Sequence, residues 1–121
     1  MVYSVLVIED EVNIRLFVTA NLRARGYSVF EAGTGTEGLE LIRSARPDLL
    51  ILDMFLPDIS GWDVLQAMTE DDRMRATPVL LMTAALPSKD ESTYPNVVQR
   101  VVKPASLTTL LSAVQAALAA H

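Results

Sequence analysis

The segment LLILDMFLPDISG, residues 49–61, places four consecutive apolar residues directly before an aspartate and ends in a loop with Pro57 and Gly61. A short apolar run bounded by turn residues is typical of a strand that is buried on both faces, as in a parallel sheet. Asp53 follows the last apolar residue, so its carboxylate is expected at the carboxyl end of that strand. The segment therefore predicts an α/β fold with a charged group where a buried strand ends.

The rest of the sequence repeats this arrangement, because short apolar runs alternate with longer stretches of helical periodicity. Gly26 is expected to end the first helix. Thr36 and Ser106 are expected to cap the second helix and the last one. The predicted strands are residues 4–8, 27–32, 49–52, 79–82 and 97–102, and the predicted helices are residues 11–25, 36–45, 61–69 and a last helix after Ser106.

The composition of the strands predicts their order in the sheet. The first, third and fourth strands are apolar on both faces, whereas the second contains Ser28 and Glu31 and the fifth contains Gln99 and Arg100. Fully apolar strands belong in the middle of a parallel sheet and mixed strands at its edges. With right-handed crossovers, this pattern favours a five-stranded parallel sheet of order 2-1-3-4-5 with helices on both faces, the flavodoxin-like doubly wound fold.

Length and composition limit the classes of function. The chain has 121 residues, of which 50% are hydrophobic, as in one globular domain spanning residues 1–121. Its net charge of −5 argues against direct binding of nucleic acid, which requires a basic surface. The sequence has no cysteine for disulfides or thiolate metal sites, and its first residues show no signal-peptide or membrane-span pattern. We therefore expect a soluble cytoplasmic domain that binds neither nucleic acid nor a membrane directly.

Acidic residues follow two of the predicted strands, at the edge where sheets of this kind bind ligands. Glu9, Asp10 and Glu11 follow the first strand, and Asp53 follows the third. Carboxylates within about 4–6 Å of one another repel, and a bound cation relieves the repulsion. Oxygen ligands without histidine or cysteine predict Mg²⁺ first and Mn²⁺ second. Alternatively, Glu9 to Glu11 cap the start of a helix, and Asp53 caps a turn before Pro57.

Two further strand ends supply a hydroxyl and an ammonium group. Thr83 follows the fourth strand, and Lys103 follows the fifth. An ammonium group there pairs with Asp53 or meets an anion bound beside it, and the hydroxyl can reach a phosphoryl oxygen. A carboxylate nucleophile, a divalent cation, a lysine and a hydroxyl are the groups that acceptance of a phosphoryl group requires. Asp53 is the candidate nucleophile; the alternatives are a strand-end hydroxyl for Thr83 and a solvated loop charge for Lys103.

Together these motifs resemble the receiver domain of two-component response regulators. The resemblance covers almost the whole chain and rests on VLVIEDE, LLILDMFLPDISGWDVL, PVLLMTA and VVKPAS. It implies that Asp53 takes a phosphoryl group from the phosphohistidine of a sensor kinase or phosphotransfer protein. The other roles that it implies are Mg²⁺ binding by Asp10, by Glu9 through water, by Asp53 and by the Phe55 carbonyl, phosphoryl binding by Thr83 and Lys103, and room for the phosphoryl group beside Ala84.

The resemblance further implies a regulator rather than an enzyme, which promotes only its own phosphorylation and dephosphorylation and then changes its contacts with an output partner or a second copy. The family shares the strand order 2-1-3-4-5, so the resemblance and the strand composition are not independent support for that order. Two features depart from the family pattern. Arg100 stands where receivers usually place an aromatic residue. Pro87 and Pro95 leave room for a short or disordered fourth helix at most between Thr83 and Lys103.

Three other functions remain open at this point. Arg100 and the short fourth-helix segment favour, as the main alternative, a constitutive interaction module whose binding does not depend on phosphorylation. An aspartate-based phosphatase would need a second aspartate where Phe55 stands. The run GTGT, residues 33–36, is only faintly similar to the phosphate loop of flavodoxins, and it follows the second strand rather than the first, so a helix-entry turn is favoured.

Overall fold

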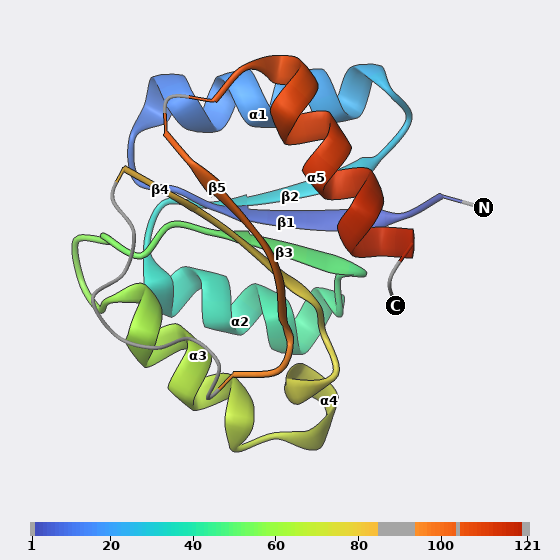
Figure 1. Ribbon diagram of the computed structural model, residues 1–121. Coiled ribbons are helices and arrows are strands. Elements are labelled where there is room, and N and C mark those ends of the chain that lie inside the picture. The colour runs from blue at the N-terminus through green and yellow to red at the C-terminus, as the bar shows by residue number, and fades with distance from the viewer. Residues whose placement is uncertain (1, 85–93, 104, 120–121) are drawn as a thin grey trace.

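The computed structural model describes residues 2–84, 94–103 and 105–119. In these residues the chain forms a five-stranded parallel sheet of order β2-β1-β3-β4-β5 (Figure 1). The fold class and the strand order predicted from the sequence are therefore confirmed. The elements are β1 (Ser4–Ile8), α1 (Val12–Ala24), β2 (Ser28–Ala32), α2 (Gly35–Ala45), β3 (Leu49–Leu52), α3 (Gly61–Thr69), α4 (Asp72–Arg75), β4 (Val79–Thr83), β5 (Val97–Val102) and α5 (Leu107–Ala119).

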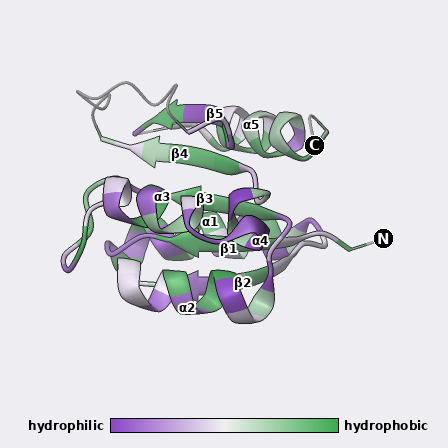
Figure 2. Cartoon of the chain, turned by 90° about the horizontal axis from the view of Figure 1, so that it is seen from below, coloured by the Kyte–Doolittle hydropathy of each residue, from purple (hydrophilic) through white to green (hydrophobic). Residues whose placement is uncertain are grey.

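Helices cover both faces of the sheet, with α1 and α5 on one face and α2 and α3 on the other (Figure 1). Successive residues of a strand point to opposite faces. Val5 and Val7 of β1 accordingly pack in the core with α1 and α5, whereas Leu6 and Ile8 pack in the core with α2 and α3. Figure 2 shows hydrophobic residues along β4 and a hydrophilic stretch in the edge strand β5. The two cores fix the strands, and hence the strand ends, relative to one another.

The helix boundaries lie within one residue of the prediction, but one predicted cap is wrong. Gly26, with φ of 89°, follows the C-terminal cap of α1, and the Ser106 hydroxyl accepts a hydrogen bond at the start of α5, as expected. The second helix begins at Gly35 and is capped by Thr34, whose hydroxyl accepts a hydrogen bond from the Glu37 N–H at 3.1 Å. Thr36 does not cap this helix, because the helix begins one residue before it; its hydroxyl instead donates to Asp58.

Two segments before β5 differ from the prediction or lie outside the described residues. The short helix α4 was not predicted, and Asp71 caps it by accepting hydrogen bonds from the Arg73 and Met74 N–H groups. The expected short or disordered fourth helix falls on residues 85–93, which lie outside the described residues. Within the part of the chain that the structure describes, every helix is too short or too polar to span a lipid bilayer.

Candidate functional site

Three of the predicted acidic residues lie together at the carboxyl ends of β1 and β3. Glu9, Asp10 and Asp53 each place a carboxylate oxygen within 4.8 Å of the others. The sheet dictates this proximity, because β1 and β3 are parallel neighbours in which Ile8 pairs with Leu52. Glu9 is fully buried and Asp53 is 4% exposed, whereas Asp10 is exposed. The cluster therefore combines two buried carboxylates with one that faces solvent.

Glu11 stands outside this cluster and serves as the N-terminal cap of α1. Its carboxylate accepts a hydrogen bond from the Asn13 N–H at 3.0 Å. The Glu11 N–H in turn donates to Glu9 Oε2 at 3.1 Å, and Arg15 Nη1 donates to the Glu9 carbonyl oxygen at 2.7 Å. Of the two roles open for this acidic run, Glu11 thus has the capping role, while Glu9 and Asp10 join Asp53.

The loop after β3 holds Asp53 in a fixed orientation. The Asp53 N–H donates to the Ile8 carbonyl at 3.1 Å, which extends the pairing of β1 and β3 by one residue. The Phe55 N–H donates to Asp53 Oδ1 at 3.2 Å. The Gly61 N–H donates to the Met54 carbonyl at 2.9 Å, so the first residue of α3 is attached to the residue after Asp53. One carboxylate oxygen of Asp53 is therefore positioned by its own loop.

Lys103 lies between the two buried carboxylates. Its Nζ donates to Asp53 Oδ2 at 3.0 Å and also to Glu9 Oε1. The sequence left open whether Lys103 pairs with Asp53 or meets a bound anion, and in this structure it pairs with Asp53 and also with Glu9. Its N–H donates to the Thr83 carbonyl at 2.8 Å. Burial lowers the pKa of Lys103, but the hydrogen bonds and charges of Glu9 and Asp53 outweigh burial and raise this pKa above its ordinary value. Lys103 is thus a fixed cation at neutral pH.

Glu9 has an unusual environment for a carboxylate. Burial raises the pKa of Glu9, and the hydrogen bonds from Lys103 and from the Glu11 N–H offset only part of this effect. A buried carboxylate is costly unless a cation lies beside it. The sequence placed Glu9 among the acidic ligands but gave no sign that Lys103 would be its direct partner.

The Thr83 hydroxyl is an unused donor in the site. Thr83 is buried, and its Oγ1 has no hydrogen-bond partner among the described residues. A buried polar atom without a partner is unfavourable by about 1–3 kcal/mol. A ligand oxygen placed there would remove this penalty. The residue after it, Ala84, is exposed.

Asp58 is a residue of this region that the sequence analysis missed. Its Oδ1 accepts a hydrogen bond from the Gly35 N–H at 2.9 Å, and its Oδ2 accepts from the Thr36 N–H at 3.0 Å and from the Thr36 hydroxyl at 2.5 Å. These bonds, led by the one from the hydroxyl, hold the pKa of Asp58 well below its usual range. Asp58 therefore fastens the loop after Asp53 to the start of α2. No local signal could reveal this contact, because its partners are 22 and 23 residues away.

An apolar pocket opens next to the site on the side of α1. It has a volume of about 500 Å³, and Lys103 and Ala84 form the wall nearest to the acidic cluster. Residues of α1, together with Met82 of β4, Ala105 and Leu110 of α5, form the remaining wall. Three apolar side chains on α1 are also exposed: Val12 at 52%, Leu16 at 52% and Phe17 at 44%. The helix next to the acidic cluster thus presents an apolar surface to solvent.

The donor set of the acidic cluster suits a hard divalent cation. Three carboxylates supply only oxygen ligands, and Asp10 keeps the cluster open to solvent. Mg²⁺ prefers such a site, with one or two carboxylates and several remaining positions for water and phosphate oxygens. Lys103 contributes one positive charge, which it shares between Glu9 and Asp53, so the three carboxylates keep an excess of negative charge. The cluster of Glu9, Asp10 and Asp53 could therefore hold a metal ion.

Comparisons with known proteins agree with this geometry. The family model of the response regulator receiver domain matches residues 5–115. The polar-differentiation response regulator DivK of Brucella anthropi is 39% identical over 89 residues, which cover 73% of this chain and 72% of DivK. The structure of the chemotaxis response regulator CheY4 of Vibrio cholerae superimposes with a TM-score of 0.85 at 28% identity and covers 98% of this chain and 100% of its own. The response regulator TrrA of Thermotoga maritima, in complex with Mg²⁺-BeF, has a TM-score of 0.84 at 29% identity and covers 96% of this chain and 99% of its own.

Proposed function

The chain belongs to the response regulator receiver family, whose members are phosphoacceptor signalling modules that interact with kinases and output partners, and we propose that Asp53 is its phosphoacceptor. The observation that carries this proposal is the setting of Asp53. It lies buried at the end of β3, with Lys103 on one carboxylate oxygen and the Phe55 N–H on the other. The donor would be the phosphohistidine of a sensor kinase or phosphotransfer protein, and the exchange would take place in the cytoplasm, where such kinases obtain ATP.

In the proposed reaction, an Asp53 carboxylate oxygen attacks the phosphorus of the phosphohistidine. The O–P bond forms as the P–N bond breaks, and the departing imidazole takes up a proton from solvent. Such a transfer depends mainly on in-line positioning and on neutralisation of charge. Lys103 already contacts Asp53, and Thr83 Oγ1 has no partner among the described residues, so both would bind oxygens of the transferred group. Water would later cleave the acyl phosphate, so the protein would promote only its own phosphorylation and dephosphorylation.

The proposed cation of this site is Mg²⁺, with Mn²⁺ as a substitute. Asp10 and Asp53 would bind it directly, together with the Phe55 carbonyl oxygen. Glu9 would act through water, because its Oε1 is already bonded to Lys103. When bound, the cation supplies positive charge that neutralises the transferred phosphoryl group. The complex of TrrA with Mg²⁺-BeF supports the choice of metal.

The surface proposed to receive the phosphodonor is the exposed apolar face of α1. A donor histidine must come close to Asp53, and α1 begins three residues after Glu9. Val12, Leu16 and Phe17 are exposed there beside the apolar pocket that Lys103 and Ala84 line. Exposed apolar side chains grouped in this way favour contact with another protein. An amphipathic helix of the donor fits this chemistry, because it would bury its own apolar face against α1.

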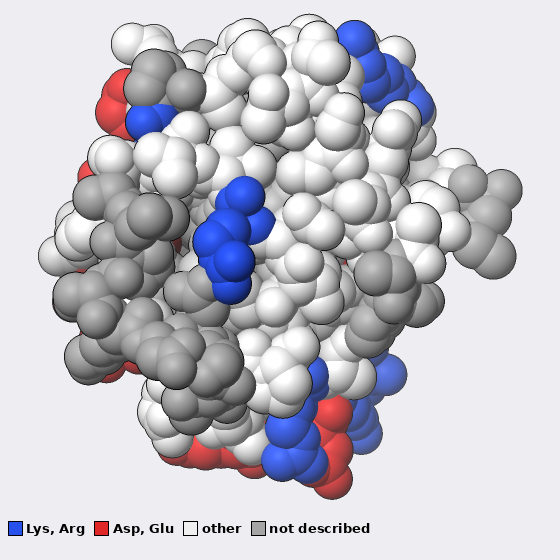
Figure 3. All heavy atoms as spheres, viewed as in Figure 1, with Lys and Arg blue, Asp and Glu red and all other residues white. Residues whose placement is uncertain are grey.

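The output surface is proposed to include the edge strand β5. Figure 3 shows a largely uncharged face over β5 and α5, with cationic atoms near its centre. Val102 at the end of β5 is 46% exposed, one residue before Lys103. A change in the partners of Lys103 on phosphorylation would therefore act directly on this strand, and an output partner or a second copy of the chain would sense it there. Arg100, which lies on β5 instead of an aromatic residue, would take part in this contact.

Intact-mass measurement after incubation with Mg²⁺ and a small acyl phosphate tests the proposal. The wild-type chain should gain one phosphoryl group, and Asp53→Asn should gain none. Asp72→Asn is the matched control, because Asp72 is an exposed aspartate on α4 and should leave the adduct unchanged. An equal adduct on Asp53→Asn, or no adduct on the wild type, would contradict the assignment.

A further inference from the structure

A second pocket lies at the end of the sheet opposite Asp53. Its walls are the C-terminal end of α2, the residues before β3, and the segment from α4 to the start of β4, and its volume is about 350 Å³. Asp53 and Thr83 stand at the carboxyl ends of β3 and β4, whereas this pocket lies at the amino ends of the same strands. The length of the sheet therefore separates it from the acidic cluster, and the proposed phosphotransfer does not use it.

Arginine side chains dominate the rim of this pocket. Arg43 on α2, Arg46 at its end and Arg73 on α4 all line it, and all three are exposed. Within the described ranges their guanidinium groups have no hydrogen bond or ion pair. The two lining carboxylates are engaged elsewhere, because Asp48 and Asp71 both accept hydrogen bonds from backbone N–H groups at 2.8 Å. Figure 3 shows cationic side chains, with acidic ones beside them, at the end of the molecule where α4 lies.

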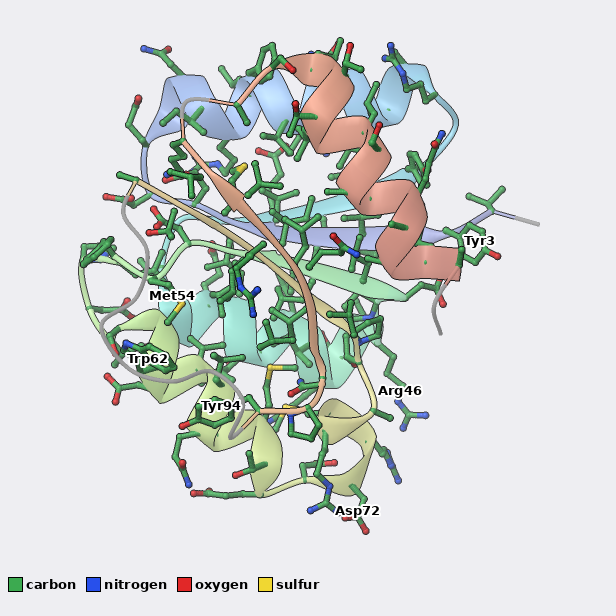
Figure 4. All side chains as sticks on the ribbon, viewed as in Figure 1. Tyr3, Arg46, Met54, Trp62, Asp72 and Tyr94 are labelled. Atoms are coloured by element: carbon green, nitrogen blue, oxygen red, sulfur yellow. The ribbon has the colours of Figure 1, made fainter. Side chains whose placement is uncertain are left out.

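Arg46 occupies a backbone conformation that disfavours arginine. It is the C-terminal cap of α2, with φ of 49° and ψ of 65°. Among the described residues it is the one non-glycine residue with positive φ. Helices commonly end with glycine in this conformation, because any β-carbon is strained there. Such strain is concentrated at functional sites. In Figure 4, Arg46 lies beyond the end of α2, on the same side of the molecule as Asp72 of α4.

The floor of the pocket is apolar. Ile42, Pro47, Met74 and Pro78 line it and are all buried. The planar guanidinium group binds phosphate through paired hydrogen bonds, and the volume lies at the lower end of the range of about 300–1,000 Å³ that small-molecule sites occupy. We propose that this pocket binds a phosphate monoester with a small organic body, its phosphate held by Arg43, Arg46 and Arg73 and its body on the apolar floor.

Titration of the ¹⁵N-labelled full chain with AMP, followed by NMR in the absence of Mg²⁺, tests the proposal. The backbone amides around Arg46 and Met74 should shift in a saturable manner, and inorganic phosphate should bind at least tenfold more weakly. Arg46→Gly and Arg73→Gln should each weaken AMP binding at least tenfold. The matched control is Arg25→Gln, which removes an exposed guanidinium group from the end of α1 and should leave AMP binding unchanged.

A thermal melt distinguishes lost binding from lost folding. Arg46→Gly should unfold at the wild-type temperature or above it, because glycine relieves the strained conformation. AMP binding to Asp53→Asn should equal that of the wild type, so this result is independent of the proposed phosphoacceptor. Absence of saturable shifts, shifts confined to residues around Asp53, equal weakening in Arg25→Gln, or phosphate binding as tight as AMP binding would each overturn the proposal.

Discussion

Replacement of Gly61 by alanine tests how closely α3 packs against the loop that carries Asp53. A methyl group on Gly61 would lie 2.7 Å from both Cα and Sδ of Met54 and 3.0 Å from the Asp53 carbonyl oxygen. Favourable carbon contacts are found at about 3.5–4.0 Å. Two of these three atoms belong to the backbone and cannot rotate away. To relieve the overlap, α3 and the loop must separate, which stretches the 2.9 Å hydrogen bond from the Gly61 N–H to the Met54 carbonyl.

The size of the effect follows from the backbone contact. Overpacking costs about 1–3 kcal/mol, and an overlap with fixed backbone atoms places Gly61→Ala at the upper end, about 2–3 kcal/mol. For a chain of this length, each kcal/mol lowers Tm by about 3–5 °C, so Tm should fall by about 6–15 °C. Phosphorylation by an acyl phosphate should also slow, because the Asp53 carbonyl must move. Thermal denaturation followed by circular dichroism and the rate of mass gain measure the two effects.

Gly33→Ala is the matched control for this substitution. Its added methyl would lie 3.1 Å from Nη1 of Arg15, at the far end of a flexible side chain, rather than against backbone atoms. A small shift of the Arg15 side chain relieves this contact, so Gly33→Ala should destabilise the fold less than Gly61→Ala does. The reasoning is refuted if Gly61→Ala lowers Tm by less than about 3 °C, or by less than Gly33→Ala does.

Four further predictions concern the site and the loop beside it. Thr83→Val should raise the free energy of unfolding by up to about 1–3 kcal/mol, because it removes a buried hydroxyl without a partner, yet it should slow phosphorylation; urea denaturation and mass gain measure both. Lys103→Met should lower the free energy of unfolding by about 3–5 kcal/mol, because two buried carboxylates lose their cation. Urea denaturation measures this loss, and an unchanged free energy of unfolding would contradict it. Mg²⁺ should raise Tm in the wild type but not in Asp10→Asn, as measured by melts with and without a chelator. The lowered pKa of Asp58 means that its stabilising effect is complete above about pH 4–5 and is lost as the pH falls towards its folded pKa, so the difference in Tm between wild type and Asp58→Asn should shrink on acidification.

The fold could be predicted because its three central strands are short and almost wholly apolar. A run such as Leu49–Leu52 can be satisfied only inside a sheet that is covered on both faces, and the polar residues of β2 and β5 mark the edges. By contrast, Asp72–Arg75 is four residues long and three of them are charged, so no apolar period announces a helix there. Thr34 and Thr36 are equivalent as caps in the sequence. In the structure Thr34 has the extended backbone of a cap and accepts the Glu37 N–H, whereas Thr36 lies within α2 and its hydroxyl donates to Asp58 in another loop.

The residues of the site could be predicted from the sequence, but the contacts between them could not. The positions of Asp53, Thr83 and Lys103 follow from the parallel strands, since each residue comes directly at or after a strand end. The sequence left Lys103 with a choice between Asp53 and a bound anion. In the structure Lys103 contacts both Asp53 and Glu9. This outcome depends on the burial of Glu9, which is a property of the assembled sheet and of no local pattern.

The two ion pairs of Lys103 also tie signalling competence to the completion of folding. They join residues that are 94 and 50 positions apart in the chain, and Lys103 follows the last strand of the sheet. Contacts of such long range form late, because the loops that they close are costly in entropy. An incompletely synthesised chain, or one whose last strand has detached, would keep Asp53 but lose the cation beside it. The proposed reactivity of Asp53 towards a phosphodonor should therefore depend on the completed fold.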